Sequence, residues 1–487
     1  MRVRLLLAVV GAALLVVAPI VVVGAGPHGV STSPFAMTAL CILVVVACVG
    51  LANFLRRLPL LAAVVVVIAL RVPLVFLPPV LSDDVYRYVH EGRAGRIALD
   101  VPYRFAPAQI SLPFDDDISA RINHKDVPAA YPPVTQLLLV VVTGVGDAIG
   151  APLAALKAFL LAVDALLIGL LFLCRHRFED ERTALTYGTH PLPLIALGLG
   201  PHLDGILALL IVGAFVVSRV PFAGRAGLRT DAESHSRARM RDVATGFLVG
   251  LAALVKPIAL LALIGLPRRA FVALGVLIGV ALPSIPYVVL GTPLLDGLLA
   301  YGSRWRAQPV LFPLFEALVS SWDRTRVAAA VYMHLHIDGT SPGLLLEESE
   351  RTIVKLGDVG PDAIRILVDG ALFARLLSAA ALIVVVALVA RSRALSGPTR
   401  TAIALGAFLL LTPTLHPWYF LWVLPFGAAL SSRTIVFASV GALALYSPKL
   451  VELAGQGWAE SPVTVLVLLL SLTLGAVLDR RARGAPA

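Results

Sequence analysis

The sequence predicts an all-α fold, a polytopic transmembrane helical bundle of about 12–14 spans. Of its 487 residues, 59% are apolar and only 14% are charged, whereas about a quarter of the residues in soluble domains are charged. The apolar residues form long runs, many of them near the roughly 20 residues that a membrane-spanning helix needs. Arginines recur in short stretches between these runs, a pattern typical of cytoplasmic loops.

The apolar runs define the expected spans of a single membrane domain over residues 1–487. The first run follows Arg2 and Arg4 and is too long for a secretory signal, so we interpret it as a span. Several later runs are short, which is typical of tilted or broken helices around a cavity. The expected segments are 5–23, 36–55, 60–80, 153–173, 184–199, 204–220, 243–255, 258–266, 270–290, 370–390, 401–413, 417–430, 434–447 and 462–478.

The positions of the arginines predict an orientation with both termini in the cytoplasm of a multi-pass cell-membrane protein. The run 134–146 is expected to lie along the surface, because a crossing there would carry the arginines at 175–182 outside. Two long loops, 82–133 and 291–369, are then external. The stretch 219–241, with six arginines, is then cytoplasmic.

The most unusual polar stretch is SDDVYRYVHEGR, Ser82 to Arg93, which directly follows the third apolar run. Lipid would exclude Asp83 and Asp84, so this pair must face water or a cavity at the membrane surface. A carboxylate placed there can act as a general base toward an attacking hydroxyl group. The alternative interpretation is a solvated cap on a helix end.

Further polar residues from separate segments are expected on the same external side. Lys256, one of five lysines, precedes Pro257 between two apolar half-segments, where a broken helix would place it at a cavity. The alternatives are a snorkelling lysine and ordinary interfacial aromatic residues. Side chains suited to clamp a phosphate are Arg87, Lys256, His202 and His416. Side chains suited to contact the rest of a substrate are Tyr86, Tyr131, Asp204, Trp305 and Trp418.

Signatures of metal and cofactor sites are missing from the sequence. The three cysteines have no metal-site spacing, and no phosphate-binding loop, HExxH or GxSxG motif occurs. We therefore expect no cofactor and no metal site, although one of the two aspartates can hold a divalent cation. Loop arginines explain the net charge of +10, so membrane lipids are expected as partners and nucleic acid is not.

Two structural contacts are also predicted. Arg71 and Asp164 fall at similar depth in their spans, and each unpaired charge at a helix centre costs about 2.5–3.5 kcal/mol, so we expect them to pair. GxxxG patterns at 246–250 and 275–279 predict close packing of two helices.

Taken in order, the motifs resemble those of bacterial polytopic glycosyltransferases of the GT-C fold class. The resemblance rests on SDDVYRYVHEGR, VPYRFAP, YPP, GPHLDG, VKP and TLHPWYFLW, which run along most of the chain. The greatest likeness is to the polyprenyl-phosphate-mannose-dependent mannosyltransferases. Val101 and Gln308 depart from that pattern, which often has Asn at both positions, and this leaves the donor sugar open.

The resemblance implies an inverting transfer of a sugar, with mannose the first choice, from a polyprenyl-phosphate donor. The acceptor would be a lipid or glycan hydroxyl group on the external face. Asp83 or Asp84 would be the base, and Arg87, Lys256 and His416 would lie near the donor phosphate. The alternatives are an arabinosyl or other hexosyl transferase of the same fold, or a lipid or solute transporter. A transporter predicts charged pathways to both faces and internal repeats, which the sequence does not show.

Overall fold

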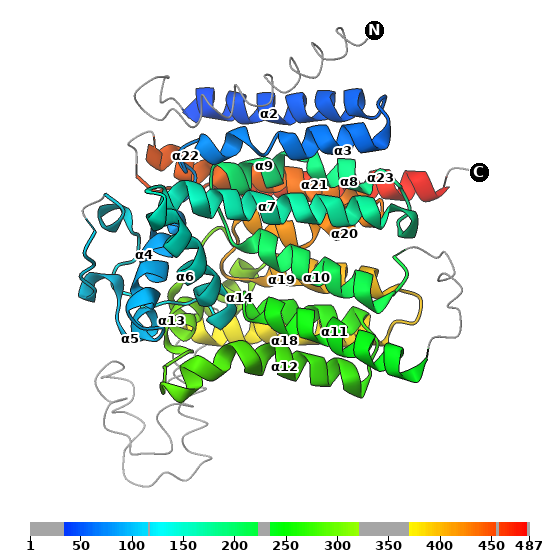
Figure 1. Cartoon of the computed structure of the whole chain (residues 1–487). Coiled ribbons are helices and arrows are strands. Elements are labelled where there is room, and N and C mark those ends of the chain that lie inside the picture. Colours follow the sequence, from blue (N-terminus) through cyan, green and yellow to red (C-terminus); the bar gives the residue numbers. More distant parts are fainter. Residues whose placement is uncertain (1–33, 115–116, 223–233, 321–369, 454–456, 485–487) are drawn as a thin grey trace, which may run out of the picture.

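The computed structural model describes residues 34–114, 117–222, 234–320, 370–453 and 457–484 (Figure 1). These residues form helices and no strand, with one isolated bridge between Ala307 and Thr414. The predicted all-α class is confirmed. The predicted first span at 5–23 and much of the loop at 291–369 lie outside the described residues.

The long helices run in similar directions, and α4, α5 and α6 lie across one end of the bundle (Figure 1). The first half of the chain contains α2 (Pro34–Leu55), α3 (Leu60–Ala69), η2 (Pro73–Phe76), α4 (Asp84–Ile97), α5 (Val101–Arg104), η3 (Pro107–Gln109), η4 (Ser119–Arg121), α6 (Pro133–Ala148), α7 (Pro152–Leu173), η5 (Arg175–Arg177), α8 (Thr183–Gly188), α9 (Pro191–Gly198) and α10 (Asp204–Ser218). The second half contains α11 (His235–Ala253), η6 (Pro257–Gly265), α12 (Ala270–Val289), α13 (Asp296–Arg304), α14 (Phe312–Ser320), α18 (Gly370–Arg391), α19 (Gly397–Leu411), η8 (Pro417–Trp422), α20 (Leu424–Ala429), α21 (Arg433–Gly441), η9 (Ala442–Tyr446), α22 (Ser447–Leu453) and α23 (Pro462–Gly484).

Several of these helices are apolar enough to cross a membrane. In the described part of the chain, α7, α12, α18, α23 and the run from α21 through α22 have the length and hydropathy of a span. Shorter apolar helices, such as α10 and α19, pack among them. The chain is therefore a multi-pass membrane protein, as its composition predicts.

Some predicted segments are broken in the structure. Residues 184–199 were expected as one segment but form α8 and α9, separated at Thr189 and His190. Pro191 explains the break, because proline disfavours helical geometry at the residue before it, and His190 is extended (φ −65°, ψ 135°). The predicted segment 258–266 corresponds to the 3₁₀ segment η6 (Pro257–Gly265), preceded by an extended Lys256 (φ −149°, ψ 128°).

The GxxxG prediction is confirmed where α11 packs against α12. A Cβ atom at Gly246 would lie 1.9 Å from the carbonyl oxygen of Val272, and one at Gly275 would lie 2.1 Å from that of Val243. Only glycine permits this backbone approach, which is the usual function of small residues between membrane helices.

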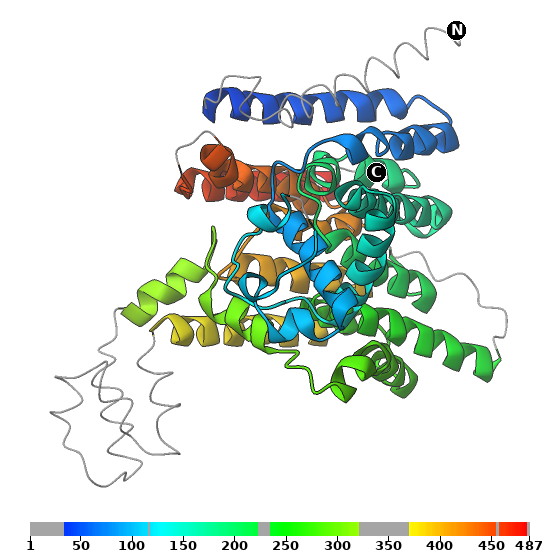
Figure 2. The same cartoon turned by 60° about the vertical axis from the view of Figure 1, so that its left-hand side comes forward.

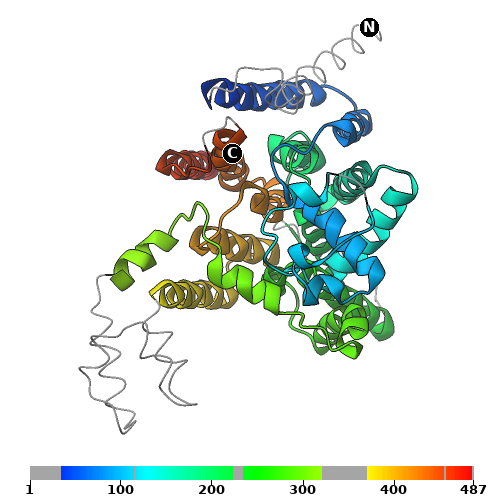
Figure 3. The same cartoon turned by 90° about the vertical axis from the view of Figure 1, so that its left-hand side faces the viewer.

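Helix α4 is fixed against α6 by similar means. A Cβ atom at Gly92 would lie 2.5 Å from the carbonyl oxygen of Leu139 on α6. On the same face, Gln136 Nε2 donates to Glu91 Oε2 over 2.7 Å, and Arg93 pairs with Asp147 over 2.7 Å. These contacts hold α4 in place beside the bundle; Figure 3 views the molecule from the α4 end.

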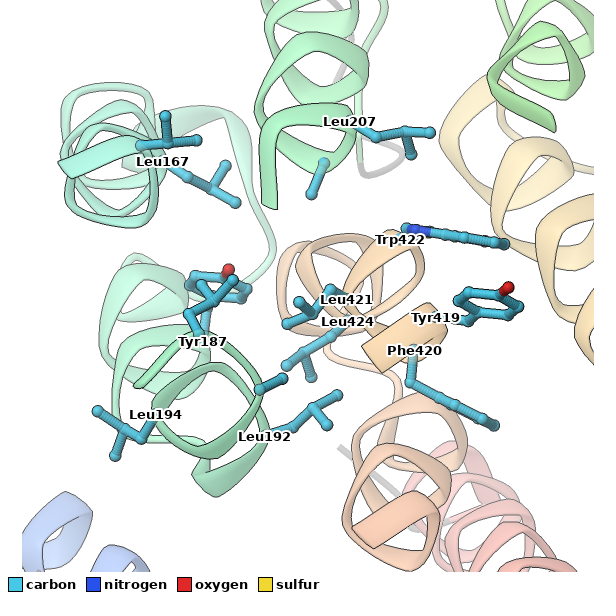
Figure 4. Close-up of a cluster of buried hydrophobic side chains, with 14 of the residues drawn as sticks. Leu167, Tyr187, Leu192, Leu194, Leu207, Tyr419, Phe420, Leu421, Trp422 and Leu424 are labelled. Carbon is cyan, nitrogen blue, oxygen red and sulfur yellow. The ribbon is translucent and has the colours of Figure 1, made fainter. Parts of the chain in front are cut away.

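The segment η8 separates the hydrophobic core from a polar region. Leu421 and Leu424 point toward Tyr187 and Leu192, whereas Tyr419 and Trp422 point the other way (Figure 4). All of these side chains are buried, with at most 2% of the residue surface exposed except at Tyr419, where it is 7%. The core thus fixes η8 rigidly, and its aromatic face becomes one wall of the cavity described below.

Arg71 and Asp164 form the predicted buried pair, with Arg71 Nε 2.9 Å from Asp164 Oδ2. Arg71 also donates to the carbonyl oxygens of Val67 and Gly188, and the Tyr187 hydroxyl donates to the second oxygen of Asp164 over 2.7 Å. The pair joins α7 to the segment that follows α3 and to α8.

We expect Arg71→Met to destabilise the protein more than the double replacement Arg71→Met, Asp164→Leu. Removing one partner of a buried pair leaves an uncompensated charge and costs about 3–5 kcal/mol, whereas an apolar replacement of both is often near neutral. Thermal unfolding in detergent measures this difference. A double variant that loses as much stability as the two single variants combined would contradict the expectation.

Candidate active site

A cavity of about 1040 Å³ lies between the N-terminus of α4 and the bundle. Its walls come from the loop before α4, the segment before α6, η6, α13, η8 and α22. The structure brings together seven of the predicted site residues along this cavity: Asp83, Asp84, Tyr131, Lys256, Trp305, His416 and Trp418. The other four, which are Tyr86, Arg87, His202 and Asp204, are not among its lining residues.

The two adjacent aspartates have different surroundings. Asp84 is the first residue of α4, where the helix dipole favours a negative charge. Its Oδ1 accepts a hydrogen bond from Asn123 Nδ2 over 2.9 Å, and no lysine or arginine pairs with it in the described part of the chain. Asp83 is instead paired with Lys449 Nζ over 2.7 Å. The carboxylate of Asp84 is therefore oriented by a neutral amide, and that of Asp83 is paired with a cation that it shares with Glu452.

Lys256 is held by a buried carboxylate. Its Nζ lies 2.8 Å from Asp204 Oδ1, which also accepts a hydrogen bond from Trp422 Nε1 over 2.7 Å. Asp204 is completely buried, and it therefore fixes the lysine rather than contacting a substrate. The ammonium group also faces the rings of Tyr419 (4.5 Å to the centroid) and Tyr131 (5.7 Å).

His202 and His416 form an aromatic stack with Trp418. The ring centroids of His202 and Trp418 are 3.5 Å apart, and those of His416 and Trp418 are 4.4 Å apart. His202 is fully buried behind the tryptophan, and its Nδ1 lies 3.7 Å from Asp84 Oδ2. Of the two histidines, only His416 lines the cavity.

Arg87 is not placed to bind a phosphate in the cavity. Its guanidinium donates to Glu91 over 2.7 Å and to the carbonyl oxygens of His124, Val127 and Pro128. These hydrogen bonds fix the loop 123–128, from which Asn123 and His124 line the cavity.

Tyr86 and Tyr131, both in the stretch 82–133, differ in position. The Tyr86 hydroxyl accepts a hydrogen bond of 3.0 Å from Arg121. Tyr86 is not among the residues that line the cavity. Tyr131 lines the cavity, and its hydroxyl is 3.0 Å from that of Tyr88. Burial, assisted by the charge of Asp84, raises the pKa of Tyr131 well above its ordinary value. The Tyr131 hydroxyl is therefore neutral at physiological pH.

Several cavity residues were not singled out in the sequence. They are Asn123, Tyr301, Arg375, Lys449 and Glu452. Arg375 lies inside an apolar run and Lys449 is one of only five lysines, so the rarity of a cation in such a place was an available signal. The others are ordinary polar residues whose proximity depends on the fold.

Arg375 is a further cation that lines the cavity. It donates to the carbonyl oxygens of Gly302, Ala371 and Trp305, and no carboxylate pairs with it among the described residues. Hydrogen bonds to carbonyl groups orient a guanidinium without neutralising its charge. Arg375 is therefore available to an anionic ligand.

Among the described residues, no group of three or more His, Cys, Asp or Glu side chains is arranged to hold a metal ion. The divalent cation considered from the sequence stays a prediction. Asp83 and Asp84 both have other partners, Lys449 and Asn123.

Comparison with known families gives two matches. Residues 4–271 match a family model described as "Alpha-(1->6)-mannopyranosyltransferase, N-terminal domain". Residues 369–480 match a model described as "MptB C-terminal domain". Searches of curated proteins and of solved structures found no match. The first match includes the acidic pair and Lys256, and the second includes Arg375, His416 and Lys449.

Proposed function

Because the chain belongs to the alpha-(1->6)-mannopyranosyltransferase family, we propose that it moves mannose from a polyprenyl phosphate to a hydroxyl group of a lipid or glycan. The family makes it a mannosyltransferase. The donor, the acceptor and the external position of the site are our proposals. The observation that supports them best is a cavity lined by the Asp84 carboxylate, by cations and by apolar side chains.

We assign the general base to Asp84. A base must be able to accept the proton of the attacking hydroxyl group, and no lysine or arginine among the described residues pairs with Asp84. As the acceptor oxygen bonds to C1 of the mannosyl group, its proton passes to Asp84 and the C1–O bond to the phosphate breaks. The electron pair of that bond leaves with the polyprenyl phosphate.

We assign the donor phosphate to Lys256 and Arg375. Phosphates are held by cationic donors that face a partly dry site, and these two side chains line the same cavity. Leu260, Leu261 and Phe408 line it beside them, which suits the first isoprene units of a lipid. In this assignment Arg87 acts indirectly, by fixing the loop that holds Asn123.

The test uses the purified full-length protein with radiolabelled polyprenyl-phosphate mannose and an alkyl α-mannoside acceptor. The proposal predicts a labelled disaccharide product whose formation depends on the protein. Transfer from a nucleotide-activated mannose but not from the lipid donor would refute the donor assignment. Movement of the labelled lipid across a vesicle membrane without product would instead indicate a transporter.

We also propose that 82–133 lies outside the cell and 219–241 inside. The opposite orientation would place six arginines in an external loop, against the usual charge distribution. Single cysteines at the exposed positions Ser111 and Ser234 test this, after the native Cys41, Cys48 and Cys174 are replaced. A membrane-impermeant maleimide should label intact cells at 111 and not at 234. The reverse pattern would overturn the orientation.

A further inference from the structure

The cavity has a second end, formed by α22 and Trp458. Lys449 Nζ lies 2.7 Å from Asp83 Oδ2 and 2.8 Å from Glu452 Oε2. Trp458, with 53% of its surface exposed, lines the cavity with this group. We call Asp83, Lys449, Glu452 and Trp458 the rim cluster. None of the assignments made above uses it as a binding site.

A row of aromatic rings separates the rim cluster from Lys256. Tyr446, three residues before Lys449, has its ring centroid 6.1 Å from that of Trp418. Trp418 is 6.2 Å from Tyr419, and Lys256 Nζ is 4.5 Å from the Tyr419 ring. Lys449 and Lys256 thus lie at different ends of this row of aromatic rings. Figures 2 and 3 show α22 (orange-red) well apart from α13 (green), which lines another part of the cavity.

The charge of the rim cluster indicates the kind of ligand. Two carboxylates and one ammonium group give a formal charge of −1, which repels a phosphate. The same groups offer acceptors and donors for the hydroxyl groups of a neutral sugar. Side chains that recognise sugars commonly combine such polar groups with an apolar surface, and the exposed indole of Trp458 supplies a flat face for the C–H side of a pyranose ring.

We propose that the rim cluster binds an uncharged mannosyl unit of the acceptor. This inference rests on the proposed function, because it takes Lys256 and Arg375 as the donor end. Asp83 and Asp84 are consecutive, so a sugar bound at Asp83 presents a neighbouring hydroxyl group to the proposed base. His202 lies 3.7 Å from Asp84 and stacks on Trp418. The proposed base therefore lies near Trp418, the middle ring of the aromatic row.

Binding of α-1,6-mannobiose to the full-length protein, followed by saturation-transfer NMR in detergent without donor, tests the proposal. We expect saturable binding to the unmodified protein. Trp458→Ala and Glu452→Gln should each weaken it about tenfold, equivalent to one or two lost contacts. Both side chains are well exposed, at 53% for the Trp458 residue and 43% for the Glu452 side chain, so the fold should tolerate these changes. Phe105→Ala, at another exposed aromatic residue (45%) away from the cavity lining, is the matched control and should bind normally.

A second measurement separates this proposal from the proposed donor. With polyprenyl-phosphate mannose as donor, the Trp458→Ala and Glu452→Gln variants should show a higher acceptor KM, an unchanged donor KM and a nearly unchanged kcat. Equal mannobiose binding by the unmodified protein and both variants, or no binding by any of them, would overturn the acceptor site. Mannobiose binding that requires Trp458, in a protein that does not use the lipid donor, would sustain the acceptor site and refute only the donor.

Discussion

Asp84→Asn lowers kcat by at least about 100-fold if Asp84 is the base, since general-base catalysis contributes roughly 10²–10⁴-fold. Asparagine keeps the size of the side chain and can still accept the hydrogen bond from Asn123, but it cannot take the proton of the attacking hydroxyl group. The donor is held elsewhere, so its dissociation constant should change little. Single-turnover transfer and donor binding, measured on the same purified protein, give the two quantities.

Asp83→Asn is the matched comparison, because it makes the same chemical change one residue away. It removes the charge that pairs with Lys449 and should act mainly on the acceptor KM, with a much smaller loss of kcat. Loss of kcat in Asp83→Asn with normal kcat in Asp84→Asn would exchange the two assignments. Near-normal transfer by the double variant would exclude both aspartates as the base.

Lys256→Ala should raise the dissociation constant of the donor about 10- to 100-fold, which corresponds to the roughly 1.5–3 kcal/mol of a hydrogen bond to a charged group. It should also lower kcat, because the clamp stabilises charge that grows on the phosphate as the bond to C1 breaks. The ammonium group is held between Asp204 and the aromatic rings, so its position is fixed before the donor binds.

A structural effect of Lys256→Ala has to be separated from lost donor binding. The single variant leaves Asp204 buried with only Trp422 as a donor, which destabilises the fold. Adding Asp204→Asn removes that buried charge, so Lys256→Ala, Asp204→Asn should regain thermal stability without regaining donor affinity. Recovery of donor binding in this double variant would show that Lys256 acts only through folding.

The sequence allowed two predictions, the class of fold and the meeting of polar residues from separate segments at one site, for a physical reason. A membrane segment excludes charge, so each exception, such as Asp84, Lys256 or the Arg71 and Asp164 pair, has to be explained by a cavity or a partner. The predicted pair forms at 2.9 Å. Lys256 and Asp84 line one cavity although they are far apart in the chain.

The direction of each side chain was not predictable in the same way. Arg87 is three residues after Asp84 on the same helix, yet its guanidinium turns to the backbone of 124–128. The direction of the Arg87 side chain depends on the position of the loop 124–128 relative to α4, which is set by the tertiary fold. Lys449 reaches Asp83 across more than 360 residues of sequence, and Asp204 is buried behind Trp422. Composition and spacing contain no information about such contacts.

An electron cryomicroscopy map of the full-length protein with a non-transferable polyprenyl-phosphate mannose analogue tests the central claim most directly. The account predicts phosphate density within hydrogen-bond reach of Lys256 and Arg375, the lipid along Leu260 and Leu261, and the mannosyl C1 facing Asp84. Phosphate density at Lys449, with the sugar at Lys256, would contradict it.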